Sequence, residues 1–357
     1  MKTRICIYCL ILLASLGCRG EEQQPDKTAW FAGKWGVFFH YLATPAGTTG
    51  EGTTVEEWNR QINAFDVEGL ANQLEKVGAD YFVITLGQGS GLVLAHNKVY
   101  DELTGFEPSK SPKRDLVSDL ADALNPRGIK VMVYTASELG WADLEMRKKL
   151  RMTDHHNDHR LGLRDPETPN DWQANRDGQA EYLEYWMQIH EHWSKKWGTK
   201  VDGWWVDGCY KKEIRFPEDE PPNLKTLKNA MLAGNPEAIV TFNGGKGVYV
   251  YSPHEDYTAG EISRKLPDCP GPWVEEGREG QSMDGHRSRF HILTYLGEKW
   301  GRGKPRYSDE QIVEFATGIT SKDGFVSFDV PPQKNGLIPE EFMPQLKHIG
   351  DSVEKSE

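Results

Sequence analysis

The sequence predicts a single α/β domain built as a (β/α)8 barrel of the TIM type. Short apolar runs, rich in β-branched and aromatic residues, alternate with segments whose apolar residues recur at helical spacing. This alternation is typical of a parallel sheet covered by helices. Eight such runs can be counted, which is the number that a closed barrel requires. Carboxylate and amide residues follow several of these runs, and barrels of this type keep their catalytic groups at such strand ends.

The amino-terminal segment is expected to direct export. Residues 1–4 are basic, residues 5–16 form an apolar run, and Cys18 follows shortly after. The apolar run is too short to cross a bilayer, so we interpret residues 1–17 as a lipoprotein-type signal peptide. Cleavage would leave Cys18 to carry a lipid anchor, in the periplasm or on the outer membrane. Plain secretion is the alternative, because Ser15 is a less usual residue at its place before the cysteine.

Residues 18–29 are polar and are expected to form a flexible tether. Removal of residues 1–17 would change the net charge from -12 to -14, since Lys2 and Arg4 are lost and no acid is. So acidic a chain is not expected to bind nucleic acid, or a membrane except through the lipid anchor.

The cysteines do not predict a disulfide framework. Of the five cysteines, Cys209 and Cys269 are the two that remain beyond the signal and the anchor position. These two could pair outside the cytoplasm, but a single pair is not a framework, and the sequence leaves their redox state open.

The expected barrel spans residues 30–351, followed by a tail over residues 352–357. The sixth and seventh units are the weakest, so the barrel is expected to be irregular there. The predicted strands are 35–40, 81–86, 130–135, 203–207, 239–243, 257–262, 290–295 and 324–330. The predicted helices are 67–77, 115–124, 179–197, 223–232, 309–317 and 340–349.

The predicted strand ends bring together residue types that suit a sugar site. Aromatic rings provide flat apolar faces for a pyranose, while amides and carboxylates bind its hydroxyl groups. Asp207 is the first catalytic candidate, because it ends an apolar strand and is followed by glycine; capping of the next helix is its alternative role. The residues expected at this mouth are His40, Tyr41, Gln88, Glu138, Trp141, Asp207, Asn243 and Glu261.

Several segments, in order along most of the chain, resemble the α-L-fucosidases of glycoside hydrolase family 29. Each segment alone is weak evidence, whereas the colinear set is strong. The matching segments are 30–41, which contains Lys34-Trp35-Gly36-Val37-Phe38-Phe39-His40-Tyr41, then 57–59, 65–66, 78–85, 113–117, 128–134, 201–208, 260–261, 270–273, 329–330 and 338–341.

The resemblance implies a retaining glycosidase in which Asp207 is the nucleophile. It favours Glu261 as the acid/base, with Glu275 and Glu276 as rivals, and Glu138 as a less favoured choice. Asp207 must stay ionised and the acid must hold its proton, so their environments have to differ. The residues expected to bind substrate are His40, Tyr41, Gln88, Trp141, Trp205, Asn243 and Trp273.

Two departures from the family bear on the sugar that is bound. Gln88-Gly89 stands where the family usually carries a His-His pair that contacts fucose hydroxyls, and Tyr41 replaces a tryptophan. The chain also ends after its last predicted helix, which predicts a catalytic barrel without the β-sandwich that many relatives append.

The chemistry that the resemblance implies needs no cofactor, and we predict no metal site. His155 and His159 stand at helical spacing beside Asp158, but they fall in a long polar insertion that favours a solvated loop. The leading hypothesis is an exo-glycosidase acting on terminal α-L-fucosyl or similarly configured residues of extracellular glycans. The alternatives are the same machinery acting on a different sugar, or an inactive surface protein that binds carbohydrate.

Overall fold

The computed structural model describes residues 26–44, 53–152 and 176–354. The expected signal peptide, the first part of the tether and the His155–His159 segment lie outside the described residues. Among the described helices, none has both the length and the apolar character needed to cross a membrane.

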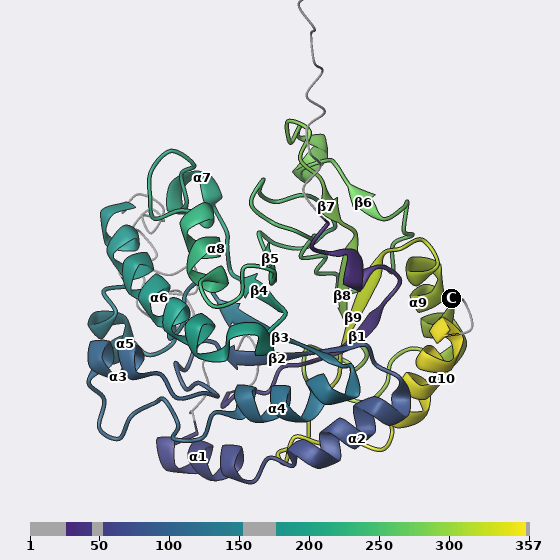
Figure 1. The fold of residues 1–357 in the computed structure, drawn as a ribbon, viewed down its shortest axis with the longest axis horizontal. Helices are drawn as coiled ribbons and strands as arrows, with labels where there is room; N and C mark the ends of the chain where they lie inside the picture. The colour runs from purple at the N-terminus through teal and green to yellow at the C-terminus, as the bar shows by residue number, and fades with distance from the viewer. Residues whose placement is uncertain (1–25, 45–52, 153–175, 355–357) are drawn as a thin grey trace, which may run out of the picture.

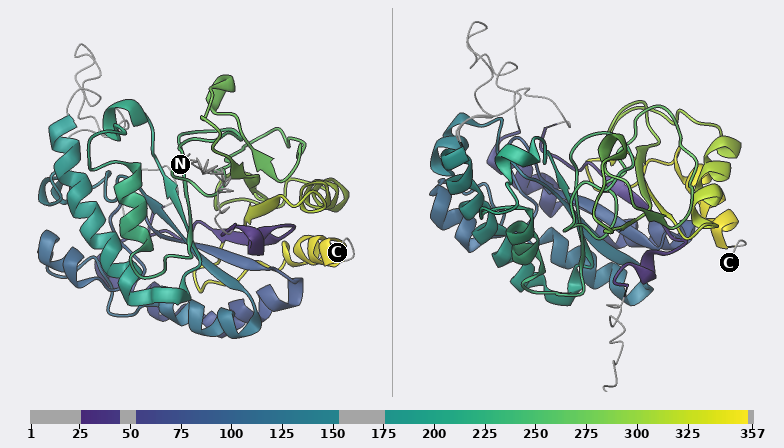
Figure 2. Two further views of the ribbon diagram at one scale, coloured as in Figure 1. Left: turned by 45° about the horizontal axis from the view of Figure 1, so that its top comes forward. Right: turned by 90° about the horizontal axis from the view of Figure 1, so that it is seen from above.

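The described part of the chain folds as a curled parallel sheet with helices on its outer face (Figures 1 and 2). Seven of the described strands form the sheet, in the spatial order β5-β4-β3-β2-β1-β9-β8. Their bounds are β1 Trp35–Phe39, β2 Tyr81–Gly87, β3 Lys130–Ala136, β4 Gly203–Asp207, β5 Ile239–Phe242, β8 His291–Tyr295 and β9 Phe325–Asp329. Every one of these neighbours is paired in parallel, so all seven carboxyl ends meet at one edge.

The helices follow the strands and pack on one another around the sheet (Figure 1). The predicted helices are found, with bounds that differ by a few residues at their ends. The larger helices are α1 Val55–Asn63, α2 Val67–Val77, α4 Leu116–Leu124, α6 Arg176–Trp197, α8 Leu224–Leu232, α9 Asp309–Thr320 and α10 Met343–Glu354. The shorter ones are α3 Lys98–Thr104, α5 Leu144–Lys149 and α7 Lys212–Arg215.

The sheet differs from the expected eight-stranded barrel at the predicted strand 257–262. This segment pairs with β8 and its flank through two isolated bridges, Tyr257 with Arg289 and Glu261 with Leu293, and not through a regular ladder. On the other side, the Asp256 amide donates to the Val240 carbonyl of β5 at 2.8 Å. The segment therefore lies between the two edge strands without forming a regular strand, as the weak sequence signal there suggested.

A small antiparallel sheet lies on the connection between β5 and β8. It pairs β6, Trp273–Val274, with β7, Ser288–Arg289. Two-residue strands carry no periodicity, so the sequence did not predict them.

The two described cysteines, Cys209 and Cys269, are both buried free thiols.

Two apolar clusters hold the sheet, one on each face. The outer cluster joins the sheet to the helices, and the inner cluster fills the concave side with side chains such as Phe38, Tyr134 and Trp205. Phe31, just before β1, stacks on Tyr81 with ring centroids 4.6 Å apart and fills the inner cluster near the amino ends of the strands. The concave side is therefore filled by aromatic rings near the amino ends of the strands.

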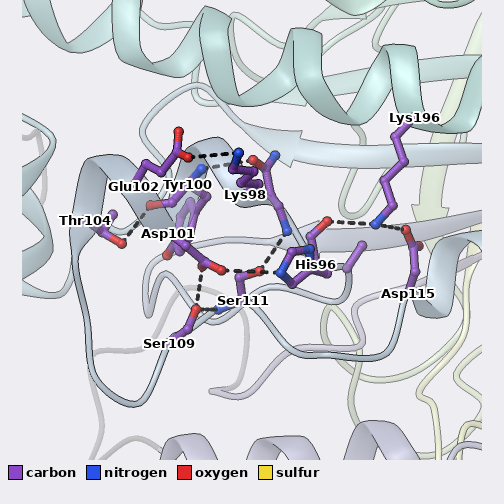
Figure 3. Close-up of polar contacts among 12 residues, drawn as sticks. His96, Lys98, Tyr100, Asp101, Glu102, Thr104, Ser109, Ser111, Asp115 and Lys196 are labelled. Atoms are coloured by element: carbon purple, nitrogen blue, oxygen red, sulfur yellow. Dashed lines mark hydrogen bonds and ion pairs between the residues drawn. The ribbon is translucent and has the colours of Figure 1, made fainter.

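A polar network fixes the long connection from β2 to α4 against α6 (Figure 3). Lys196 of α6 donates to the His96 carbonyl at 2.9 Å and pairs with Asp115 at 2.6 Å. The Asn97 amide donates to the Ser111 hydroxyl at 2.8 Å. These contacts lie on the outer side of the fold, so we assign them to support of the connection.

Gly350 tests how closely α10 packs on α2. A Cβ atom at Gly350 would lie 1.9 Å from the Val77 carbonyl oxygen, which is backbone and has little room to move. We expect Gly350→Ala to lower the free energy of unfolding by about 1–3 kcal/mol, as overpacking does, in denaturant titrations followed by circular dichroism.

Gly318 of α9 supplies the matched control, because a Cβ atom there would meet nothing within 4 Å. Gly318→Ala is expected to leave stability unchanged or to raise it by about 0.5–1 kcal/mol, since alanine favours the helix. Equal effects of the two substitutions would contradict the close approach at Gly350.

Candidate active site

Asp207 is the last residue of β4, and its carboxylate lies at the carboxyl edge of the sheet. Tyr134 donates its hydroxyl to Oδ2 at 2.6 Å, and the Asn243 amide donates to Oδ1 at 2.9 Å. The Gly208 backbone N–H also donates to Oδ1, at 2.8 Å. Gly208 has φ +73°, a left-handed conformation that glycine adopts without steric cost. Three donors thus converge on a group that accepts hydrogen bonds when ionised.

Asn243 joins Asp207 to a second carboxyl group. Its Nδ2 donates to Asp207 Oδ1 at 2.9 Å and to Glu261 Oε2 at 2.7 Å. Two oxygens bound to one nitrogen at these lengths lie no more than about 5.6 Å apart. The Asn243 oxygen accepts from the Gly245 amide at 3.0 Å, so the orientation of the side chain amide is fixed.

Glu261 reaches this position from the segment between β5 and β8. Gly260 comes so close to β8 that a Cβ atom would lie 1.9 Å from the His291 carbonyl oxygen, so a larger residue would push the segment away. The Glu261 carbonyl accepts from the Gly247 amide at 2.9 Å, which ties the loop after β5 to it. These backbone contacts therefore hold Glu261 where its carboxyl group can accept from Asn243, which also binds Asp207.

The environment of Glu261 favours its protonated form. Burial, and then the neighbouring charge of Asp207, raise the pKa of the Glu261 carboxyl above its ordinary value. The Asn243 hydrogen bond, Lys246 and His40 act in the opposite direction without reversing the shift. The two carboxyl groups are thus placed in different environments.

Tyr134 and Trp205 form the floor beneath Asp207. Their rings stack with centroids 5.3 Å apart, and the Trp205 indole N–H donates to the Ala259 carbonyl at 3.1 Å. Burial and the charge of Asp207 raise the pKa of Tyr134 well above its ordinary value, so its hydroxyl stays a donor. Gln88 donates from Nε2 to that hydroxyl at 2.6 Å, so Gln88 is linked to Asp207 through Tyr134.

His40 lies at the same edge, after β1. Its Nδ1 is 3.0 Å from Asp329 Oδ1, and Asp329 also accepts from the Gly301 amide at 2.6 Å. The imidazole ring lies 5.6 Å from the rings of both Tyr134 and Trp300, measured between centroids. The contact with the Asp329 carboxylate fixes the orientation of the ring, and Nε2 lies on the opposite side of the ring from this contact.

Trp141 occupies the space beside Gln88-Gly89. A Cβ atom at Gly89 would lie 2.9 Å from Cε2 of Trp141. The two loops are also joined by backbone bonds, from Gly140 to Gln88 and from Ala142 to Gly89, both at 2.9 Å. A glycine at position 89 is therefore required by the ring of Trp141, which comes from the loop after β3.

A buried ion pair lies behind the loop that follows Asp207. Arg215 Nη2 is 3.4 Å from Glu138 Oε1, and both side chains are almost fully buried. Arg215 also donates to the carbonyls of Gly208 at 2.7 Å and Tyr210 at 3.4 Å. Glu138, the less favoured acid candidate, is thus occupied in holding the arginine that supports this loop.

Two residues expected to bind substrate lie elsewhere. Tyr41 is buried on the helix side of the sheet, donates to the Lys334 carbonyl at 2.6 Å and packs on Trp58. Trp273 pairs with Arg289, which precedes β8, and its ring stacks under the Arg287 and Arg289 guanidinium groups. Trp273 therefore lies near the amino end of β8, away from the polar edge.

The two rival acids are exposed on the connection between β5 and β8. Glu276 forms an isolated bridge with Ser282, and its carbonyl accepts from the Val250 amide at 2.9 Å. Among Glu261, Glu275 and Glu276, the structure gives Glu261 the shared contact with Asp207.

Several residues at the site carried a signal that the sequence analysis did not use. Asp329 ends β9 as Asp207 ends β4, and Tyr134 lies near the end of β3, so both follow the strand-end rule. Trp300 and Tyr210 come from loops, where no pattern distinguishes them. Within the described residues there is no group of three or more histidine, cysteine, aspartate or glutamate side chains placed to hold a metal ion.

Comparison with solved structures supports the fold. An endo-fucoidan hydrolase of glycoside hydrolase family 107, MfFcnA4, matches at a TM-score of 0.65 and 15% identity over 91% of this chain. This chain spans only 53% of that hydrolase's length. The α-L-fucosidase isoenzyme 1 of Paenibacillus thiaminolyticus matches at 0.58 and 19% identity, covering 91% of this chain and 74% of the fucosidase.

A third structure is a variant of the α-L-fucosidase AlfC bound to Fuca(1,6)GlcNAc. It matches at a TM-score of 0.57 and 16% identity, over 93% of this chain and 99% of AlfC. At these identities the likeness concerns the fold alone. No curated protein matches the sequence.

The family model described as alpha-L-fucosidase matches residues 53–356, which is most of the chain. The protein belongs to the α-L-fucosidase family and is a glycoside hydrolase.

Proposed function

We propose that the protein is a retaining exo-glycosidase that releases terminal α-L-fucosyl or similarly configured residues from extracellular glycans. Asp207 is the nucleophile and Glu261 is the acid/base in this proposal. Family membership supports the class of substrate. The observation that carries the mechanism is the Asn243 amide, which binds an oxygen of each carboxyl group.

The spacing of the two groups favours retention. Retaining glycosidases keep their carboxyl groups about 5–5.5 Å apart, whereas inverting ones need roughly 6.5–9.5 Å to fit a water molecule. The limit of about 5.6 Å set by Asn243 agrees with the shorter distance. The raised pKa of Glu261 suits a group that must hold a proton until the glycosidic bond breaks.

The reaction follows from these positions. Asp207 attacks the anomeric carbon while the bond to the leaving oxygen breaks and Glu261 gives that oxygen its proton. Glu261, now ionised, removes a proton from water, and the water oxygen displaces Asp207 from the anomeric carbon. Tyr134 and Gly208 keep the Asp207 carboxylate in place, and His40, oriented by Asp329, is positioned to bind a sugar hydroxyl.

A specific observation also favours the same machinery acting on a different sugar. Position 89 cannot carry a histidine beside Trp141, because even a Cβ atom would contact the indole. An aromatic face in this place contacts C–H groups of a sugar, whereas histidine contacts hydroxyls. The sugar accepted at this side is thus set by Gln88 and Trp141.

Export and a lipid anchor at Cys18 remain part of the proposal, and they concern residues outside those described. An exported enzyme would meet extracellular glycans directly, which agrees with a carbohydrate partner.

The catalytic assignment predicts the outcome of two substitutions. Asp207→Asn is expected to reduce hydrolysis of aryl α-L-fucosides to background, because the amide cannot form the glycosyl-enzyme bond. Glu261→Gln is expected to reduce kcat/KM by about 10²–10⁴ with a poor leaving group, and by less with dinitrophenol, which needs no proton. Proton NMR of the wild-type reaction should show the α anomer as the first product.

Glu275→Gln and Glu276→Gln are the matched controls, and both should keep wild-type rates. Loss of activity in one of these, with activity kept in Glu261→Gln, would move the acid to that residue. A first product of β configuration would refute double displacement, and turnover of another sugar in place of the fucoside would support the second candidate.

The pKa of Glu261 predicts the basic limb of the pH profile. The acid must be protonated, so kcat/KM should fall as the pH rises through the raised pKa of Glu261. Lys246 lowers that pKa, so Lys246→Gln should move the basic limb to higher pH. Asp207→Asn removes the like charge, and NMR titration of Glu261 in this variant should give a lower pKa.

The exposed Lys265 provides a control, since Lys265→Gln removes a positive charge from a residue that is not among the groups acting on Glu261. A shift of the basic limb as large as that of Lys246→Gln would show an effect of net charge alone.

A further inference from the structure

A groove of about 470 Å³ lies between the loop after β4 and the loop after β5. Its lining includes Tyr210, Gly244, Tyr249 and Arg278. This volume falls within the range of about 300–1,000 Å³ that small-molecule sites occupy. The catalytic carboxyl groups themselves are not part of its lining.

The groove lies close to the catalytic pair. Gly244, which lines it, directly follows Asn243, whose amide holds both carboxyl groups. Tyr210 is close enough to both acids that the charge of Asp207, more than burial, raises its pKa, with a further contribution from Glu261. The loop over residues 244–250 is bonded to Glu261 through the Gly247 amide. The groove therefore lies next to the pair, and the loop that forms one of its walls is bonded to Glu261.

Cations line this groove, although the whole chain has a net charge of -12. The charged residues of its lining are three cations, Lys211, Lys212 and Arg278, and one acid, Glu213. The Lys212 ammonium donates to the Tyr251 carbonyl at 2.7 Å and lies 5.2 Å from the centre of its ring. Lys211 is exposed, and its backbone has a left-handed conformation with φ +59°.

Arg278 is held beside the entrance. Its guanidinium lies over the Tyr249 ring, 5.4 Å from the centroid, and Nη2 would be 3.4 Å from a Cβ atom at Gly245. The guanidinium therefore lies next to the turn that carries Asn243. An arginine in this setting can bind a sulfate or carboxylate group through two parallel N–H bonds.

We propose that this groove binds the leaving-group sugar and that it selects a sugar carrying an anionic group, either a sulfate ester or a carboxylate. The proposal rests on the proposed function, because Glu261 protonates the leaving oxygen and the leaving group must therefore extend past Glu261. The Tyr210 and Tyr249 rings supply apolar surface for the sugar, while Lys211 and Arg278 supply the charge.

The test compares the full chain with the double variant Lys211→Gln/Arg278→Gln. The substrates are α-L-fucosyl disaccharides whose reducing-end sugar is neutral, O-sulfated or a uronic acid. We expect the wild type to prefer an anionic disaccharide in kcat/KM, and the double variant to lose about tenfold on it while the neutral one changes little. Added salt should reduce the wild-type preference, because both cations are exposed.

Lys225→Gln/Lys265→Gln is the matched control, since it removes the same charge from exposed residues outside the groove lining. This control should behave as the wild type. A preference for the sulfated disaccharide alone would assign sulfate, a preference for the uronic acid alone would assign carboxylate, and equal preference would assign anionic groups in general.

Calorimetric binding of the same three disaccharides separates this proposal from the catalytic one, because it needs no turnover. Tighter binding of an anionic disaccharide that the double variant loses supports the groove even if no fucoside is hydrolysed. No preference for the anionic disaccharides, or a preference that the double variant keeps, would overturn the proposal while leaving the catalytic assignment to its own test.

Discussion

Two carboxyl groups that share one amide nitrogen repel each other when both are ionised, and this repulsion organises the site. Asn243 holds an oxygen of Asp207 and an oxygen of Glu261 no more than about 5.6 Å apart. A single proton on the pair removes the repulsion, and burial of Glu261 favours its carboxyl as the place for that proton. Asp207 instead receives the hydroxyl of Tyr134 and the amides of Asn243 and Gly208, which suit a carboxylate. One nitrogen thus links two acids, and the different roles proposed for them come from their surroundings and not from their chemistry.

The parallel sheet makes this contact possible. Val206 of β4 pairs with Phe242 of β5, so the next residue on each strand, Asp207 and Asn243, emerge side by side. The backbone N–H of Asn243 donates to the Val206 carbonyl at 2.7 Å, which continues the strand pairing up to the site. Beneath the loop, the pair of Arg215 with Glu138 is weak evidence for stability, because burial of both ions costs about what their attraction returns. Its contribution lies in the carbonyl oxygens that Arg215 binds after Asp207.

The regular strands and most helices could be predicted because their apolar residues are continuous or periodic, and Asp207, Asn243 and Glu261 followed from strand-end positions. The weak signal over 257–262 predicted an irregular unit but not its path, because that path depends on the backbone contact that Gly260 permits with His291. Tyr41 illustrates a rule that was available. Successive residues of an extended chain point to opposite faces, so Tyr41 joins the outer core when His40 faces the site. Trp273 was placed by motif order alone, and motif order does not carry a position in space.

At Gly89 the constraint is of a different kind, the exclusion of one side chain by another. The indole of Trp141 and a side chain at position 89 cannot both occupy the same volume, so the glycine and the tryptophan are a matched pair. Gln88, by contrast, is fixed through its bond to the hydroxyl of Tyr134 and so is coupled to Asp207 itself. A change at Gln88 would therefore alter the surroundings of Asp207, the proposed nucleophile, as well as the proposed sugar site. Trp141 is buried and belongs to the outer apolar cluster, so a change there would alter core packing as well as the space beside Gln88. In the proposed function, sugar selection therefore depends on a side chain that also stabilises the fold.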